Sequence, residues 1–225
     1  MRPQTEETTY QELPAFERVA NLLRDEMIAG KLLGGQTLIE SELAERHQIS
    51  RNTVREALRQ LLCEGLVVYQ RNKGVTVRTM TRADIKDIYI IRRTLELQAV
   101  GGDRYIKQET LKRLWDTIEI VESAARDDDW PTVATYSLRF HQVIVSILGS
   151  ARFNSFFASI VAQLRLLFAS APDEKFFQYP WVERDHQIYQ LLRSGDRQAA
   201  CQLLTQYLQD SEQSLLTLFV TKESL

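Results

Sequence analysis

The sequence has no long apolar run and only two cysteines. No apolar stretch reaches the roughly 18 residues needed to span a bilayer, and the polar opening MRPQTEETTYQ lacks the apolar core of a signal peptide. Cys63 and Cys201 each lie inside an apolar helical pattern, which gives neither a disulfide framework nor a metal-ligand spacing. These absences argue against a membrane protein and a disulfide-rich secreted domain, so we expect a cytoplasmic protein with reduced thiols.

Charge is nearly balanced overall but is distributed unevenly along the chain. The 225 residues are 44% hydrophobic and 26% charged, with a formal charge of −2, which is ordinary for one large or two modest globular domains. Residues 1–45 contain four basic and nine acidic residues, whereas residues 46–82 contain eight basic and two acidic residues. The stretch 46–82 is therefore a basic patch, which predicts that the first third of the chain binds a polyanion.

The first third of the chain predicts three helices followed by a β-hairpin. Apolar residues recur at helical spacing in three segments, and the third has Ser50 as an N-cap and stops at Gly65. Two β-rich runs then flank RNKG, which supplies glycine where a hairpin needs a positive φ. The expected helices cover residues 12–30, 40–47 and 50–65, and the strands cover 67–70 and 75–78. This order predicts a winged helix-turn-helix.

The third expected helix begins SRNTVREALRQL and separates an apolar side from a cationic side. The apolar side is expected to anchor it on the first two helices through Val54, Leu58, Leu61 and Leu62. The side chains expected to reach base edges in the major groove are Arg51, Asn52, Thr53 and Arg55. Arginine can bind guanine and asparagine can bind adenine through paired hydrogen bonds, and a threonine methyl can contact thymine. The competing interpretation is a solvated helix face.

The run LIESELAERHQISRNTVREALRQLLCEGLV, followed by NKGVTV, resembles the GntR family of bacterial transcription regulators over residues 14–80. The resemblance implies the DNA contacts just named, with Lys73 and Gly74 at the wing tip approaching the minor groove. An unengaged tip lysine and a glycine that only serves the turn are the alternatives.

Two positions depart from the family pattern. Ser41 stands where the fatty-acid-regulator (FadR) branch often has arginine, which predicts a weaker DNA contact from the second helix. Gln48 stands where the turn usually has glycine, which predicts a left-handed backbone at a cost of about 1 kcal/mol.

The remainder of the chain predicts six helices and no strand, joined by short breaks that suit antiparallel neighbours. The first has Thr81 as a cap with Asp84 three residues later. The expected helices cover residues 81–102, 109–126, 130–148, 151–171, 181–195 and 196–220. The fold class is thus mainly α, with a winged helix-turn-helix domain over residues 1–78 and an all-α antiparallel bundle, for effector binding and dimerisation, over residues 79–225.

The motifs IIRRTLE, RFHQVI and RDHQIYQLLRSGDRQAA resemble the ligand-sensing domain of the same branch, to about residue 210. Members commonly hold a divalent metal through an Asp and a His four residues apart and two later His. The resemblance places these positions at Ser137, His141, His186 and Tyr207. Only His141 and His186 would then remain as metal ligands.

The changed positions favour an organic effector over a metal. A serine hydroxyl is a poor substitute for a carboxylate, and tyrosine ligates only as a phenolate. We therefore expect no resident metal, and an effector carboxylate bound by Arg92 with Ser137, His141, His186 and Tyr207 around it. The alternatives left open are a metal-dependent sensor that uses the same cavity, and a plain core in which Arg92 and Glu96 form an ordinary helix pair.

Together these patterns predict an effector-responsive transcription regulator, a repressor rather than an activator. We expect a homodimer that binds a palindromic operator in double-stranded DNA, because one reading helix contacts too few base pairs for specificity. An enzyme working in the helical cavity is the alternative of another class, but the sequence offers no nucleophile motif and no glycine-rich phosphate loop. A purely architectural DNA binder would not require the bundle.

Overall fold

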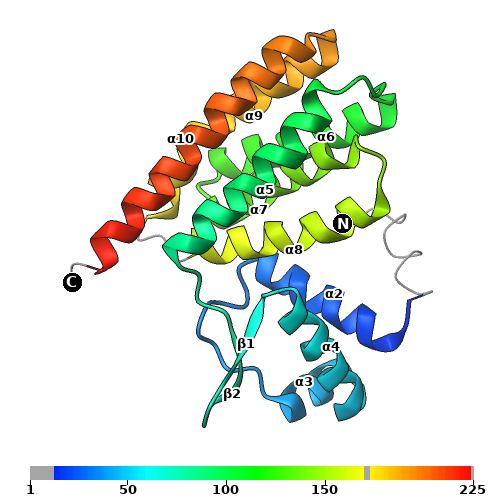
Figure 1. Cartoon of the computed structure of the whole chain (residues 1–225), viewed down its shortest axis with the longest axis vertical. Helices are drawn as coiled ribbons and strands as arrows, with labels where there is room; N and C mark the ends of the chain where they lie inside the picture. The colour runs from blue at the N-terminus through cyan, green and yellow to red at the C-terminus, as the bar shows by residue number, and fades with distance from the viewer. Residues whose placement is uncertain (1–12, 170–172, 224–225) are drawn as a thin grey trace. The chain divides into compact units, whose positions relative to one another are not determined.

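A computed structural model describes residues 13–169 and 173–223 (Figure 1). The chain separates into two compact units, with the boundary between Thr79 and Met80. Among the described residues, the first unit contains three helices and a two-stranded sheet, and the second contains six helices. The predicted fold class is confirmed. The predicted helix ends at residues 12, 170 and 171 lie outside the described residues.

Three helices form the core of the first unit. Their bounds are α2 Ala15–Ile28, α3 Glu40–His47 and α4 Arg51–Cys63. The apolar side of α4 packs against α2 and α3, and Val54, Leu58 and Leu61 are each at most 3% exposed. Leu62 was expected in this core but is 46% exposed. Residues 54, 58 and 61 follow one face at helical spacing, and residue 62 lies 100° around the helix from Leu61.

The ends of the short helices follow the predicted local chemistry. The Ser50 side chain accepts a hydrogen bond from the backbone N–H of Thr53 at 3.1 Å and thereby caps α4. Gln48 adopts the left-handed region, with φ 54° and ψ 46°, between α3 and α4. The turn therefore carries the strain that a glycine would avoid.

A β-hairpin forms the wing of the first unit. Strands β1 Val67–Gln70 and β2 Gly74–Val77 pair antiparallel, with Gln70 opposite Gly74. Gly74 has a φ of 75°, which is the positive value that the hairpin requires. An isolated bridge between Thr37 and Thr76 holds the wing against the segment that precedes α3.

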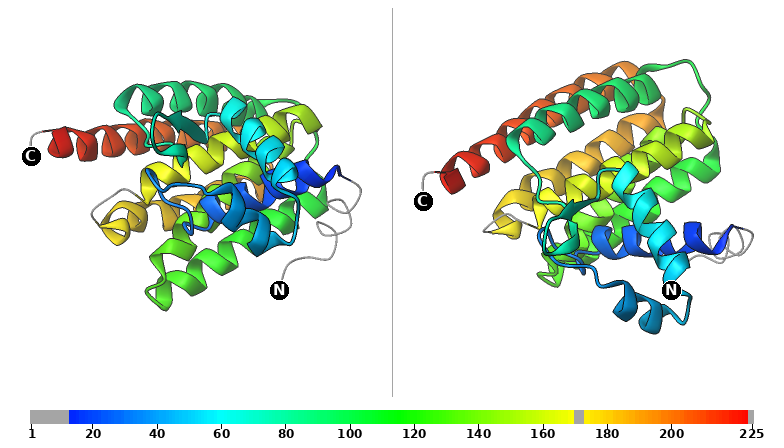
Figure 2. Two further views of the ribbon diagram at one scale, coloured as in Figure 1. Left: turned by 90° about the horizontal axis from the view of Figure 1, so that it is seen from below. Right: turned by 60° about the horizontal axis from the view of Figure 1, so that its bottom comes forward.

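The second unit is a bundle built around α7 (Figure 2). Helix α7 packs against α5, α6, α8 and α9, and its residues Phe140, Ile144 and Val145 are fully buried. The Thr81 and Asp84 side chains form the predicted capping box at the start of α5. The bounds are α5 Arg82–Gly101, α6 Gln108–Arg126, α7 Trp130–Ser146, α8 Ala151–Phe168, α9 Glu174–Ser194 and α10 Arg197–Glu223.

Helices α5 and α10 are joined by polar contacts along their length, and we call this set the α5–α10 ladder. At one end the Arg82 guanidinium donates to the carbonyl of Leu216 at 2.6 Å. At the other end the Arg197 guanidinium donates to the carbonyl of Ala99 at 2.6 Å, to that of Val100, and to two carbonyls just after α5. Between these ends lie the pairs Tyr89–Ser211 at 2.5 Å and Arg93–Glu212 at 2.6 Å.

Helix α9 begins seven residues earlier than the sequence suggested. The Asp173 side chain caps it by accepting from the Phe176 N–H at 2.9 Å, and Pro180 lies inside the helix. Proline lacks an N–H, so the Phe176 carbonyl loses its helical partner while the helix continues. The prediction treated Pro180 as the end of a loop.

None of the described helices has the length and apolar character that a membrane crossing requires.

We predict that Gln48→Gly stabilises the protein, because glycine adopts the left-handed backbone of this turn without a Cβ clash. The free energy of unfolding should rise by about 0.5–1 kcal/mol, as measured by urea denaturation of the full chain. Asn72→Gly, at a φ of 70° in the wing turn, is the control and should gain less because asparagine tolerates this region better. A loss of stability in Gln48→Gly would contradict the prediction.

Candidate functional site

The N-terminal side of α4 is open to solvent. Arg51, Asn52 and Arg55 are exposed and Thr53 is partly exposed, whereas Val54 between them is buried. The Thr53 hydroxyl lies 2.8 Å from that of Ser50, so its position is fixed by the cap. The four predicted base-reading residues are thus brought together on one accessible surface at the start of a helix, which also favours nearby phosphate.

Ion pairs distinguish the arginines of α4. Arg55 pairs with Glu40 of α3 at 2.9 Å, and this hydrogen bond holds the pKa of Glu40 below its ordinary value. Arg59, one turn later, pairs with Glu56 of its own helix at 2.5 Å. Arg51 makes no ion pair within the described part of the chain. Arg51 is therefore available to an external anion. Arg55 can bind such an anion only if its ion pair with Glu40 breaks.

The remaining predicted DNA contacts lie on two other elements. Ser41 is exposed in the first turn of α3. Lys73 is exposed at the hairpin tip, next to Gly74, whose positive φ alone accounts for a glycine there. Neither observation assigns a contact, and these positions stay predictions.

A buried polar cluster occupies the centre of the bundle, where α5, α7, α9 and α10 meet. Glu96 accepts from Arg92 Nε at 2.7 Å and lies 2.6 Å from His141 Nδ1, so one carboxylate joins α5 to α7. Ser137 donates to Asp185 of α9 at 2.7 Å. The cluster comprises Arg92, Glu96, Ser137, His141, Asp185 and Tyr207, each at most 3% exposed.

Electrostatics in the cluster follow from burial and close pairing. Burial raises the pKa of Glu96, but Arg92 and His141 outweigh that effect and hold the pKa below its ordinary value. Burial raises the pKa of Asp185 to about 6, because its neighbours compensate only in part. Burial also raises the pKa of the Tyr207 phenol well above its ordinary value. Arg92 and Glu96 thus form a charged pair, and Tyr207 is a neutral phenol.

The structure does not bring His186 into this cluster. Its side chain is 31% exposed, lies 3.3 Å from Glu122 of α6 and contacts Gln190 at 2.9 Å. Asp185, which the sequence analysis did not select, occupies the inner position instead. The sequence contained a signal for Asp185. Trp181, Ile188 and Leu192 mark the buried face of α9, and residue 185 falls on that face at helical spacing.

The cluster does not fit a divalent metal. Around His141 and Asp185 the further positions are Ser137, whose hydroxyl already donates to Asp185, and Tyr207, whose high pKa disfavours the phenolate that would bind a metal. The described residues contain no group of three His, Cys, Asp or Glu arranged for a metal ion. The buried Arg92 cation beside this set adds repulsion.

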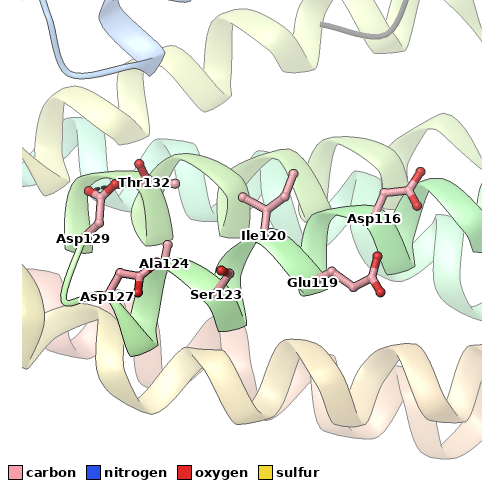
Figure 3. A pocket seen from close by; sticks show the side chains of 8 residues that line it. All are labelled: Asp116, Glu119, Ile120, Ser123, Ala124, Asp127, Asp129 and Thr132. Atoms are coloured by element: carbon pink, nitrogen blue, oxygen red, sulfur yellow. Dashed lines mark hydrogen bonds between the residues drawn. The ribbon is translucent and has the colours of Figure 1, made fainter. Parts of the chain in front are cut away.

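A separate surface depression of about 510 Å³ lies along α6 and the start of α7 (Figure 3). Its lining includes four carboxylates and no basic side chain, and it contains none of the predicted site residues. A carboxylate ligand would be repelled there. The lining residues are Asp116, Glu119, Ile120, Ser123, Ala124, Asp127, Asp129 and Thr132.

Both units match known protein families. The profile described as "Bacterial regulatory proteins, gntR family" matches residues 15–77, and the FCD domain profile matches residues 87–210. The gluconate operon transcriptional repressor of Bacillus subtilis is 24% identical over 216 residues, which cover 92% of this chain and 88% of the repressor. The transcriptional repressor GlaR of Escherichia coli is 30% identical over 139 residues, which cover 57% of this chain and 60% of GlaR.

Solved structures agree with these matches. A transcriptional regulator GntR from Rhodococcus sp. RHA1 has 35% sequence identity and a TM-score of 0.82, and the match covers 90% of this chain and 97% of that one. McbR/YncC of E. coli shares the fold, with a TM-score of 0.78 at 20% identity over 91% of this chain and 98% of that one. The family and its relatives regulate transcription and are not enzymes. This chain belongs to the GntR family of bacterial transcription regulators, with an FCD domain following its DNA-binding domain.

Proposed function

We propose that this protein is a cytoplasmic repressor that binds a palindromic operator as a homodimer and changes its operator affinity when a small organic acid binds in the bundle. The observation that carries the DNA-binding part is the exposed edge of α4, where Arg51 and Arg55 stand beside Asn52 above a buried anchor. This edge has the residue types that read base edges, at the helix end that enters the major groove.

The homodimer is proposed from the size of the reading surface. A single recognition helix presents three or four base-reading side chains, which is too few for a unique genomic site. A two-fold dimer doubles the contacts and matches a two-fold operator. The bundle is the unit that we assign to dimerisation.

An organic acid is proposed as effector because the bundle buries a cation away from water. Arg92 is 2% exposed and fully charged beside Glu96, and a guanidinium with a free donor is the natural partner of a carboxylate. Relatives named for a gluconate operon and a D-xylose utilization operon support a role in controlling the use of small organic compounds. The mismatch of Ser137 and Tyr207 with metal ligation favours direct binding over a metal-dependent sensor.

We predict that Arg51→Ala and Arg55→Ala each weaken operator binding by about 1–3 kcal/mol and reduce sequence preference, because each removes donors to base edges. Fluorescence anisotropy with a selected operator and a scrambled duplex, at one fixed salt concentration, measures both effects. Arg59→Ala is the matched control, since Arg59 lies a turn further along the helix and is paired with Glu56. If both variants retain parental affinity and preference, the assignment of α4 fails.

We predict that at least one small organic acid changes operator affinity of chelator-treated protein by about 1–3 kcal/mol, the usual range of coupling between two sites. Arg92→Lys keeps the charge beside Glu96 but removes the free guanidinium donor, so it should lose the response while still binding operator. Arg93→Lys is the control, because Arg93 pairs with Glu212 outside the cluster. A response in which Arg92→Lys matches the parent would argue against this site.

A further inference from the structure

Glu40 is held beside the exposed edge of α4 by the packing of α3, which lies next to α4 (Figure 1). It is the first residue of α3, and Leu43 and Ala44, which follow it on that helix, are buried at 3% and 8% exposure. The carboxylate lies at the helix N-terminus, where the helix dipole favours a negative charge. The short helix therefore carries a fixed carboxylate to the side of Arg55.

The contact between Glu40 and Arg55 engages only part of the guanidinium, which has five N–H groups. Nε of Arg55 donates to Oε1 of Glu40 at 3.2 Å, and Nη2 donates to Oε2 at 2.9 Å. Two parallel hydrogen bonds of this kind fix the plane of the guanidinium. Nη1 of Arg55 makes no hydrogen bond to any residue that the structure describes. Both N–H groups of Nη1 and the second N–H of Nη2 therefore remain open.

The open end of the guanidinium matches a guanine. Nη1 and Nη2 present two donors side by side, which is the geometry that pairs with O6 and N7 of guanine in the major groove. These acceptors carry no net charge, so they can be bound while Glu40 stays in place. A DNA phosphate differs, because it has the same sign of charge as Glu40 and competes with it for the guanidinium. Arg51, which has no ion pair within residues 13–169 and 173–223, is not restricted in this way.

The Glu40–Arg55 pair is too exposed for its main effect to be on stability. The two side chains are 34% and 51% exposed, and ion pairs at such positions contribute little to the free energy of unfolding. A substitution of Glu40 should therefore leave the melting temperature nearly unchanged. An effect of such a substitution on DNA recognition can then be separated from an effect on folding.

We propose that Glu40 is a positioning residue that reserves Arg55 for one guanine of the operator. This inference rests on the proposed function, in which α4 reads the major groove. Glu40 orders the Arg55 side chain before DNA arrives, so less conformational entropy is lost when the guanine is bound. It also lowers the attraction of Arg55 for phosphates, which are the same in every sequence. Both effects raise the ratio of operator binding to non-specific binding.

The test first locates the base pair that Arg55 reads. Fluorescence anisotropy at one fixed salt concentration compares an operator, selected by the parent protein from random duplexes, with duplexes that change one base pair at a time. Arg55→Ala should lose preference at one guanine-containing base pair by about tenfold or more. Glu40→Gln keeps the size of the side chain but removes its charge and one of its two acceptors. It should lose about fivefold or more at the same base pair and bind a scrambled duplex more tightly.

Glu42→Gln is the matched control, because Glu42 is an exposed carboxylate in the same first turn of α3, and it should keep the parental preference. In an Arg55→Ala background, Glu40→Gln should change preference by less than about twofold, because the group that it positions is absent. Glu40→Ala also removes the acceptors and keeps a good helix former, so it takes the place of Glu40→Gln if that variant does not fold.

Four results overturn the inference. In the first, Arg55→Ala loses preference at no single base pair. In the second, Glu40→Gln keeps the parental preference at the base pair that Arg55 reads. In the third, its effect is as large without Arg55, or is spread evenly over the operator. In the fourth, Glu42→Gln loses as much preference as Glu40→Gln. The proposed function is judged separately, because it stands if the parent protein selects an operator whatever Glu40 contributes.

Discussion

The Glu96 carboxylate is the contact on which the arrangement of the bundle depends. It pairs with Arg92 on its own helix and with His141 on α7, and all three side chains are removed from water. Taking charges into a core is costly, so each partner is tolerated only because the others are present, and removing one leaves an uncompensated charge. The same carboxylate fixes which atoms of Arg92 and His141 are engaged, namely Nε of Arg92 and Nδ1 of His141.

The first unit was largely predictable because its signals are local. The Ser50 cap, the left-handed turn at Gln48 and the wing glycine each follow from a few neighbouring residues, and the structure shows the cap and both backbone conformations. Leu62 was the exception, since Leu61 and Leu62 are adjacent apolar residues and the sequence does not reveal that only Leu61 faces the core. The pairing of Arg55 with Glu40 joins two helices, and the sequence alone gave no measure of that distance.

The bundle was predictable as a set of helices but only partly as a site. Arg92, Ser137, His141 and Tyr207 meet as expected, whereas Asp185 lies inward in place of His186. Choosing between adjacent polar residues requires the buried face of α9, and Pro180 obscured where that helix begins. From the sequence, Glu96 was considered only as the partner of Arg92 in an ordinary helix pair, because four-residue spacing does not reveal its second contact with His141.

The α5–α10 ladder makes those two helices a single rod. Its contacts occur near both ends and twice between them, so sliding or tilting one helix against the other would break several of them. Arg92 sits on this rod, while His141 and Asp185 belong to α7 and α9, which lie outside it. Arg82, the first residue of the rod, lies ten positions and about 15 Å from Arg92 and follows directly on the chain that leaves the wing. In the proposed function, an effector that moves α5 at the cluster would act on the helix that directly follows the wing.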